Sequence, residues 1–192
     1  MSLLKRIWPA KDTMTLDEST PKLRVLMVCL GNICRSPTAE AVLRQKLVQS
    51  GLAAWVAVDS AGTYGGHAGS PPDERAQRHA LRRGYHMDHL RARQVKARDF
   101  RDFDLILAMD SDNFERLRDL CPDDALVPKL HKLTDFLSAD AAHTGVQAVP
   151  DPYYGGPDGF ERVLDLVEAA CDGVVHYLHQ KLCQPTQGSP SV

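Results

Sequence analysis

The residues with the clearest capacity for chemistry occupy one short stretch, Cys29 to Ser36, which reads Cys-Leu-Gly-Asn-Ile-Cys-Arg-Ser. Five residues separate the thiol of Cys29 from the guanidinium of Arg35. A loop curled around a tetrahedral anion would place the sulfur beneath the anion and the guanidinium beside it. The planar fork of an arginine can hold two anion oxygens at once. The spacing therefore predicts phosphoryl transfer through a cysteine nucleophile.

Two elements must position this loop. The apolar run Arg24 to Val28 is typical of a buried strand, and it ends at the sulfur. Ser36 and Pro37 form a helix start, with a hydroxyl residue at the cap and proline at the first helical position. Apolar residues at helical spacing then continue until Ser50. Unpaired backbone N–H groups at a helix start favour negative charge, so this helix would bind phosphate oxygens and favour a thiolate.

The remaining loop residues would shape the cradle. Gly31 and Asn32 tolerate positive backbone φ best, which lets successive N–H groups turn inward. The Ser36 hydroxyl could donate a hydrogen bond to the sulfur. The full set of predicted phosphate-binding residues is Leu30, Gly31, Asn32, Ile33, Cys34 and Ser36. A cysteine five residues from an arginine also occurs by chance, and a buried cysteine is usually inert. The order of strand, loop and helix start favours function, and the absent lysine excludes a nucleotide P-loop.

A proton donor for the leaving group is predicted at Asp151. It lies between Pro150 and Pro152, in a segment too stiff for a helix or a central strand. We assign Asp151 as general acid and then as the base that activates water against the phosphocysteine. Burial or the bound phosphoryl dianion would keep its carboxyl protonated. The alternative is a turn, because Asp-Pro commonly initiates one and the aspartate would then only cap it.

Aromatic residues follow directly. Tyr153 and Tyr154 could present a ring face to an aromatic substrate, which favours phosphotyrosine over phosphoserine. Packing of the loop is the alternative for either ring. Asp110 ends the apolar strand predicted at Leu105 to Met109, near the site. It could orient other groups there or cap the helix predicted at 111–120.

Three stretches, Val28 to Ser36, Asp59 to Thr63 and Asp151 to Gly155, together resemble low-molecular-weight protein tyrosine phosphatases. The resemblance extends from Lys22 to about Lys181. It implies an α/β fold with a single-domain, four-stranded parallel sheet flanked by helices. The phosphate-binding loop would join the first strand to the first helix. The resemblance also implies that Asn32 and Ser60 support this loop by hydrogen bonds.

One wall of the pocket departs from the family pattern. Many relatives carry an aromatic residue shortly after the Ala-Gly-Thr stretch, whereas this chain has Gly66 at the position that aligns with it. The aromatic residue is displaced to Tyr64. The predicted substrate wall therefore consists of Tyr64, Tyr153 and Tyr154, and the sequence leaves the effect of Gly66 on specificity open.

Five irregularly spaced cysteines argue against a secreted disulfide framework and fit the reducing cytoplasm. They are too scattered for a zinc site, so we predict no metal and no cofactor. Cys34 is predicted as a redox residue. If peroxide oxidises the Cys29 thiolate to a sulfenic acid, a neighbouring thiol can rescue it as a disulfide.

A chain of 192 residues without internal repeats fits one domain. We predict an N-terminal extension at 1–20, a phosphatase domain at 21–183 and a flexible tail at 184–192. No segment approaches the roughly 18 apolar residues of a membrane span. A run of basic residues lies between Arg75 and Arg101, but a net charge of -2 and the lack of a recognised module disfavour nucleic acid.

The expected partner is a tyrosine-phosphorylated protein. The resemblance extends to bacterial relatives that act on tyrosine kinases, whereas the oligomeric state is not predicted.

Alternating patterns predict further elements of a parallel sheet covered on both faces. These are a strand at 55–58, a helix at 73–83, an edge strand starting within 126–129 and a final helix capped by Asp158 with Glu161 three residues on.

Two other functions remain open. An arsenate reductase could use the same anion loop, but the resembling thiol-coupled kind needs a further close pair of cysteines, and only Cys121 lies in the corresponding region. A non-catalytic phosphate-binding redox sensor would leave Asp151 without a purpose.

Overall fold

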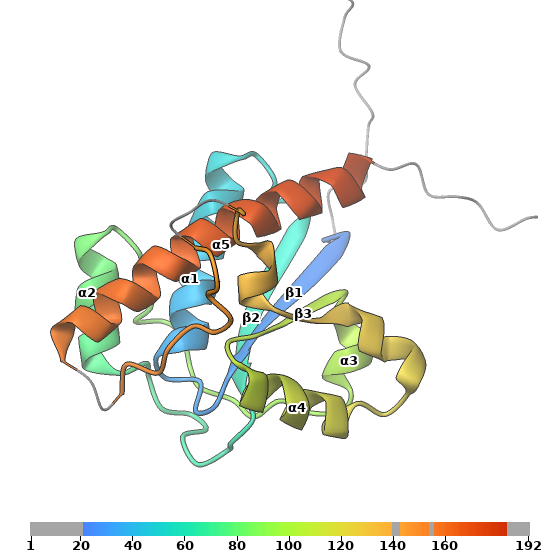
Figure 1. Ribbon diagram of the computed structural model, residues 1–192, viewed down its shortest axis with the longest axis horizontal. Coiled ribbons are helices and arrows are strands. Elements are labelled where there is room, and N and C mark those ends of the chain that lie inside the picture. The colour runs from blue at the N-terminus through green and yellow to red at the C-terminus, as the bar shows by residue number, and fades with distance from the viewer. Residues whose placement is uncertain (1–20, 140–142, 154–155, 184–192) are drawn as a thin grey trace, which may run out of the picture.

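The computed structural model describes residues 21–139, 143–153 and 156–183. They form a single domain in which helices flank a four-stranded parallel sheet, as predicted (Figure 1). The elements in chain order are β1 (Leu23–Cys29), α1 (Arg35–Gln49), β2 (Val56–Gly62), α2 (Glu74–Arg82), α3 (Asp99–Asp102), β3 (Leu105–Ala108), α4 (Ser111–Leu120), the 3-10 helix η1 (Asp124–Lys129), β4 (Leu130–Lys132), the 3-10 helix η2 (Leu133–Phe136) and α5 (Pro157–Cys183).

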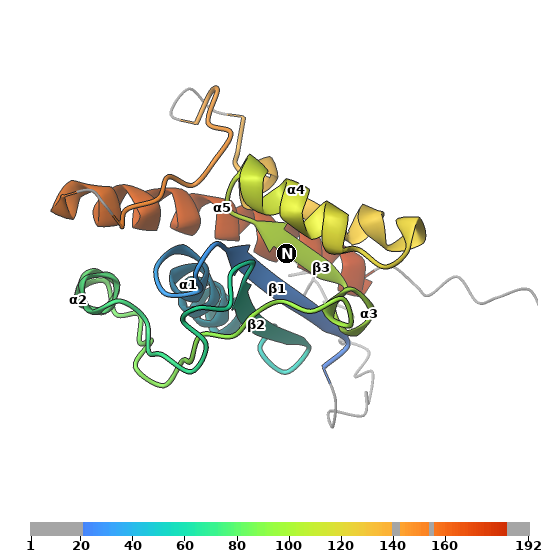
Figure 2. The same ribbon diagram turned by 90° about the horizontal axis from the view of Figure 1, so that it is seen from below.

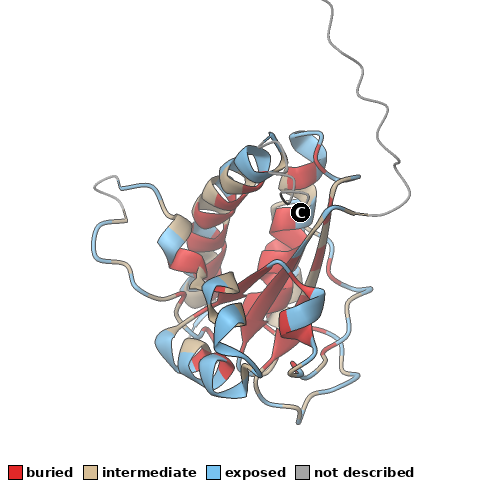
Figure 3. Ribbon diagram, turned by 90° about the vertical axis from the view of Figure 1, so that its right-hand side faces the viewer, coloured by how far each residue is buried: buried red, intermediate tan, exposed pale blue. Residues whose placement is uncertain are grey.

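The sheet has the strand order β2-β1-β3-β4, so β1 lies in its interior. Alternate residues of a strand point to opposite faces. Val25 and Met27 accordingly belong to the core between the sheet and the helices α1 and α5, whereas Leu26 and Val28 pack on the other face, near α3 and α4. Because both faces are covered, β1 is apolar along most of its length. Figure 3 shows buried residues along the strands and on the helix surfaces that face them.

Helix α2 lies beyond α1, away from the strands, and packs mainly against α5 (Figure 2). Ion pairs join the two helices. Glu161 of α5 accepts hydrogen bonds from His79 and from Arg83, and Arg83 also contacts Asp165 and Glu168. These pairs fix the beginning of α5, which follows the segment that contains Asp151.

The start of α1 corrects one prediction. The helix begins at Arg35, so Ser36 is inside the first turn and does not cap it. The residue at the cap position is Cys34, which forms no side-chain capping bond. The hydroxyl of Ser36 is directed into the loop instead. The end of the helix is as predicted, with Ser50 at the C-cap and Gly51 at a φ of 74°.

The strand predictions were correct in place and inexact in length. β2 begins one residue later than predicted and continues to Gly62, which lies beside Cys29 in the parallel register. Of the stretch Asp59 to Thr63, which carried part of the family resemblance, all residues but Thr63 therefore belong to β2, at the carboxyl edge of the sheet. β3 ends at Ala108, although the N–H of Met109 still donates to the carbonyl of Val28 at 3.0 Å.

Two predicted boundaries were wrong. The segment 126–129 belongs to the 3-10 helix η1, and the edge strand β4 starts only after it, at Leu130. The side chain of Asp123 caps η1 by accepting the N–H of Ala125, and Pro128 fits inside the tight turn. Helix α5 begins at Pro157, so Asp158 lies in its first turn and does not cap it. Proline is favoured at the first helical position, which explains the earlier start.

The predicted extension at 1–20 and tail at 184–192 lie outside the described residues, and the domain boundaries stay predictions. Within the described residues, no helix combines the length and the apolar character that crossing a membrane requires.

Candidate active site

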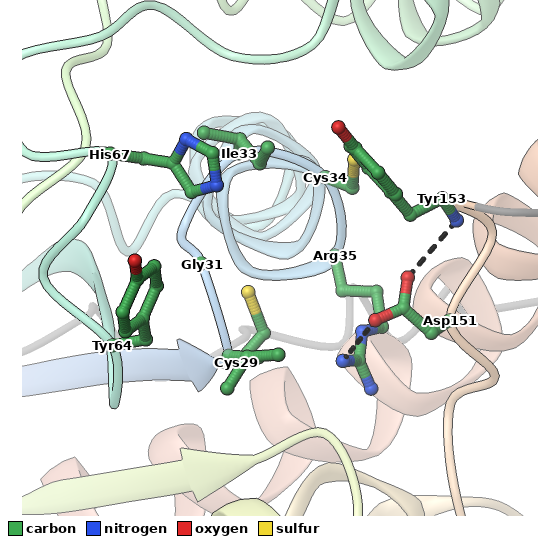
Figure 4. A pocket seen from close by; sticks show the side chains of 10 residues that line it. Cys29, Gly31, Ile33, Cys34, Arg35, Tyr64, His67, Asp151 and Tyr153 are labelled. Carbon is green, nitrogen blue, oxygen red and sulfur yellow. Dashed lines mark hydrogen bonds and ion pairs between the residues drawn. The ribbon is translucent and has the colours of Figure 1, made fainter.

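A pocket of about 240 Å³ opens at the carboxyl end of β1. The loop Cys29 to Arg35, apart from Asn32, forms its floor, and the segments that carry Tyr64 and Asp151 form opposite sides (Figure 4). Ligands of parallel α/β sheets bind at this edge. The three residues predicted to be catalytic, Cys29, Arg35 and Asp151, all line this one pocket.

The sulfur of Cys29 is held from two directions. The backbone N–H of Asn32 donates to it at 3.2 Å, and the Ser36 hydroxyl lies 3.0 Å away in a hydrogen bond, as predicted. Cys29 itself is only 3% exposed. These two hydrogen bonds fix the position of the sulfur at the floor of the pocket, where a nucleophile is needed.

Asn32 gives the loop its shape. Its φ of 57° is in the left-handed region, which asparagine tolerates better than most residues. Its side-chain amide donates to the hydroxyls of Ser36 and Ser60, both at 2.9 Å, and its oxygen accepts the N–H of Arg93 at 2.8 Å. The predicted support of the loop by Asn32 and Ser60 is therefore present in the structure. Gly31 has no positive φ; a Cβ there would lie 3.1 Å from the ring of His67.

The hydrogen bonds continue from Ser60 into the core. Its hydroxyl donates to Glu40 at 2.7 Å, and Arg44 forms an ion pair with the other oxygen of that carboxylate at 2.8 Å. Burial raises the pKa of Glu40 above its ordinary value. Glu40 was not predicted as part of the site. The signal in the sequence was a carboxylate among the apolar residues 39–43, and the structure shows that this part of α1 is buried, where an unpaired charge would be costly.

Arg35 joins the two sides of the pocket. Its buried guanidinium contacts Asp110 at 2.5 Å and Asp151 at 2.8 Å, and it donates to the carbonyl of Val149 at 3.2 Å. Burial opposes its charge, but Cys29, Asp110 and Asp151 together raise the pKa of Arg35. Asp110 also accepts the N–H of Asn113 as the cap of α4. Both roles that the sequence left open for Asp110 therefore occur together.

Asp151 is less enclosed than expected. Its side chain is 43% exposed, so the carboxyl is not buried. One oxygen contacts Arg35, and the other accepts the N–H of Tyr153 at 3.0 Å (Figure 4). The second contact is an Asx-type turn. The turn that the sequence offered as an alternative thus coexists with a position in the pocket.

The wall opposite Asp151 contains Tyr64 and His67, whose rings form an edge contact with centroids 6.1 Å apart. A Cβ at Gly66 would lie 2.3 Å from ring atoms of Tyr64. The ring of Tyr64 therefore occupies the space that a side chain at position 66 would need. His67 was not predicted as part of the site, because its position depends on the fold of this loop. On the other side, Tyr153 lines the pocket as predicted, and Tyr154 lies outside the described residues.

Cys34 also lines the pocket. Burial, assisted by Asp73 and Cys29, raises the pKa of the Cys34 thiol to about 12. It is therefore protonated at neutral pH, and all five cysteines of the chain are free in this structure. The two cysteines of the loop thus have different environments.

A family model described as low molecular weight phosphotyrosine protein phosphatase matches residues 24–184. The low molecular weight protein-tyrosine-phosphatase of Streptomyces coelicolor is 43% identical over 159 residues, which are 83% of this chain and 95% of that relative.

Solved structures agree. A protein tyrosine phosphatase from Entamoeba histolytica, crystallised with Hepes in the active site, superposes with a TM-score of 0.78 at 41% identity, over 83% of this chain and 99% of that one. YfkJ from Bacillus subtilis superposes with a TM-score of 0.77 at 38% identity, over 86% and 99% of the two chains. The chain therefore belongs to the low-molecular-weight phosphotyrosine protein phosphatase family and is a phosphatase of that type.

Proposed function

We propose that the protein hydrolyses phosphotyrosine in phosphorylated proteins through a covalent phosphocysteine intermediate. One observation carries the proposal: Cys29, Arg35 and Asp151 line the same small pocket, although Asp151 is 116 residues from Arg35 in the sequence. A nucleophile, an anion clamp and a proton donor are the groups that this reaction needs.

In the first step, the Cys29 thiolate attacks phosphorus while the bond between phosphorus and the phenolic oxygen breaks. Asp151 transfers its proton to that oxygen, so tyrosine leaves as a neutral phenol. The loop amides and Arg35 hold the phosphoryl oxygens. A bound dianion competes with Asp151 for the Arg35 guanidinium, and its negative charge favours the protonated carboxyl. Substrate binding itself would thereby prepare the general acid.

In the second step, the ionised Asp151 takes a proton from water, and the water oxygen attacks phosphorus. The bond between phosphorus and sulfur breaks, inorganic phosphate leaves, and the thiolate of Cys29 is restored. The sulfur is now the leaving group. Its hydrogen bonds from Asn32 and Ser36 stabilise the negative charge that returns to it.

The pocket walls support an aromatic phosphate as substrate. Tyr64 and His67 lie on one side and Tyr153 on the other, so a phenyl ring can contact aromatic side chains on both faces. Such contacts contribute about 0.5 to 1.5 kcal/mol each. As the partner we propose a tyrosine-phosphorylated protein, with a bacterial tyrosine kinase as a candidate.

We further propose that Cys34 acts as the resolving thiol after oxidation of Cys29. Both thiols line the same pocket, and both belong to the same short loop. A sulfenic acid on Cys29 would condense with the thiol of Cys34 to a disulfide, with release of water. Five free cysteines suit the reducing cytoplasm, which is the compartment we propose.

An arsenate reductase is not favoured. Its thiol-coupled form needs two more cysteines close together, and Cys121 lies alone at the end of α4, whereas Cys171 and Cys183 are on α5.

The test is hydrolysis of a phosphotyrosine peptide and a phosphoserine peptide of the same sequence, with a chelator present. We expect turnover of the phosphotyrosine peptide alone, loss of turnover in Cys29→Ser and full turnover in the matched control Cys121→Ser. Absence of turnover with both peptides would contradict the proposal. Release of phosphate with Cys29→Ser would refute the phosphocysteine intermediate.

A further inference from the structure

Arg75, in the first turn of α2, connects this helix to the segment that carries Asp151. Its guanidinium donates to the backbone carbonyl of Tyr153 at 3.0 Å. The central guanidinium carbon lies 5.3 Å from the centroid of the Tyr153 ring and 5.1 Å from that of Phe160. Arg75 does not itself line the pocket. It therefore contacts the segment of the proposed general acid from outside the pocket.

The other end of the connection is the phosphate-binding loop. Arg75 forms a two-pronged ion pair with Asp73, with N–O distances of 3.0 and 2.9 Å. The backbone N–H of Asp73 donates to the carbonyl of Ile33 at 2.7 Å. Hydrogen bonds from Arg75 also hold the pKa of Asp73 below its ordinary value. Arg75 is thereby fixed relative to the floor of the pocket.

Asp151 consequently has two anchors. One carboxylate oxygen contacts Arg35 at 2.8 Å. The other accepts the N–H of Tyr153 at 3.0 Å, and the carbonyl of Tyr153 is held by Arg75. The first anchor is direct, and the second acts through the backbone of Tyr153.

A bound phosphoryl group would compete with the first anchor alone. The dianion competes for Arg35, and protonation of Asp151 removes the charge that attracts this guanidinium. The contacts of Arg75 with Asp73 and with the Tyr153 carbonyl involve neither the phosphoryl group nor the ionised form of Asp151. A carboxyl that is 43% exposed would otherwise be free to move when its proton is needed.

We propose that Arg75 is a positioning residue. It keeps the carboxyl of Asp151 directed toward the leaving oxygen after Arg35 has exchanged its contact with Asp151 for one with the phosphoryl group. The assignment rests on the proposed function, because it takes Asp151 as the general acid. It adds a residue of α2 to the machinery of the first chemical step.

The experiment uses Arg75→Met, which removes the charged fork and keeps an apolar stem beside the two rings. Arg78→Met is the matched control, because Arg78 is on the same helix and its nearest carboxylate, Glu74, is 3.8 Å away. Two substrates separate positioning from folding. The tyrosine of a phosphotyrosine peptide has a pKa of about 10 and needs a proton to leave, whereas the phenolate of a dinitrophenyl phosphate leaves without one.

With Arg75→Met, the rate of phenol release from the phosphotyrosine peptide in the first turnover should fall by about 10- to 100-fold, the usual cost of a misplaced catalytic group. The first-turnover burst of dinitrophenolate, which reports the first step alone, and inhibition by inorganic phosphate should change little. Arg78→Met should leave both substrates as in the wild type. An equal fall of the first-turnover rate for both substrates with Arg75→Met would overturn the proposal, since it would indicate a general loss of structure.

Amide hydrogen exchange at Tyr153, with inorganic phosphate bound, is a second measurement that does not depend on turnover. It should be faster in Arg75→Met than in Arg78→Met, and equal rates would overturn the positioning role. If the wild type hydrolysed neither substrate, the proposed function would fail, and this exchange rate would still decide whether Arg75 holds the segment. Should Arg75→Met not fold, Asp73→Asn keeps a capping residue and removes the ion pair, and the same substrate-dependent fall is expected.

Discussion

The phosphate-binding loop, Cys29 to Ser36, forms the floor of the pocket, and the acid segment, Val149 to Tyr153, forms one of its sides, but the two are held in different ways. The loop lies between β1 and α1. The side chains of Asn32 and Ser36 are buried, and both form hydrogen bonds to residues of β2. The acid segment is anchored at Val149, whose N–H donates to the carbonyl of Met109 at 2.8 Å. Beyond that residue, Asp151 and Tyr153 are exposed and Pro152 is buried.

The difference follows from what each region must do. A cradle for a tetrahedral anion works best when its donors are fixed before the anion arrives, because no reorganisation is then needed. A proton donor must change its charge during the reaction, so it is held by contacts that can be exchanged. The ion pair between Asp151 and Arg35 is such a contact.

Among the variants, Asp151→Asn should separate the roles of the two regions most clearly, because it should lower turnover and leave phosphate binding intact. Loss of the proton donor should lower kcat for a phosphotyrosine peptide by about 100- to 10,000-fold. Inhibition by inorganic phosphate should persist, because the loop is untouched. Steady-state kinetics with phosphate as inhibitor measures both, and Asp158→Asn is a control in the first turn of α5. Loss of phosphate binding in Asp151→Asn would mean that the two regions do not act separately.

A change in the loop should affect stability as well as turnover. Asn32→Gly removes three hydrogen bonds and leaves buried partners unsatisfied, which should lower the free energy of unfolding by about 1 to 3 kcal/mol. Asn32→Ala should lower the free energy of unfolding by about 1 kcal/mol more than Asn32→Gly does, because alanine disfavours the left-handed backbone. Urea denaturation measures both variants. Equal stabilities of the two would show that the φ of 57° carries no cost.

A third test concerns the two thiols of the loop. After a brief exposure to peroxide, the wild type should recover activity on addition of a thiol reductant. Cys34→Ser should recover a smaller fraction, because its Cys29 sulfenic acid oxidises further without a resolving partner. Activity before and after reduction provides the measurement, with Cys121→Ser as control. Equal recovery of Cys34→Ser and the wild type would exclude the resolving role.

The smallest effect is expected at the rim. Tyr64→Ala should raise KM for a phosphotyrosine peptide by about 2- to 12-fold, which corresponds to an aromatic contact of about 0.5 to 1.5 kcal/mol. The free energy of unfolding should not change, since Tyr64 is 56% exposed. Leu81→Ala removes an equally exposed apolar side chain on α2 and serves as control. An unchanged KM would remove Tyr64 from the substrate wall.

The phosphate-binding loop could be predicted because its residues are consecutive and its flanking elements have clear patterns. A buried strand before Cys29 and a helix start after it determine where the sulfur and Arg35 lie. The same local signals predicted α4 with its Asp110 cap. They failed at 126–129, where the apolar residues form a turn and the edge strand is only three residues long.

The partners of the site were not predictable, because they depend on which distant segments meet. Arg75 and Tyr153 are 78 residues apart, and nothing in their spacing indicates a contact. Glu40 is understood only once Ser60 of β2 is placed beside α1. The sequence thus contains the chemistry of the loop, while the positioning of the acid is a property of tertiary structure.

The ring of Tyr64 above Gly66 has an evolutionary consequence. A side chain added at Gly66 would meet the outer ring atoms of Tyr64, and this exposed ring would have to turn away. The effect of a replacement at position 66 therefore depends on the residue at position 64. Evolutionary change at these two positions should be correlated.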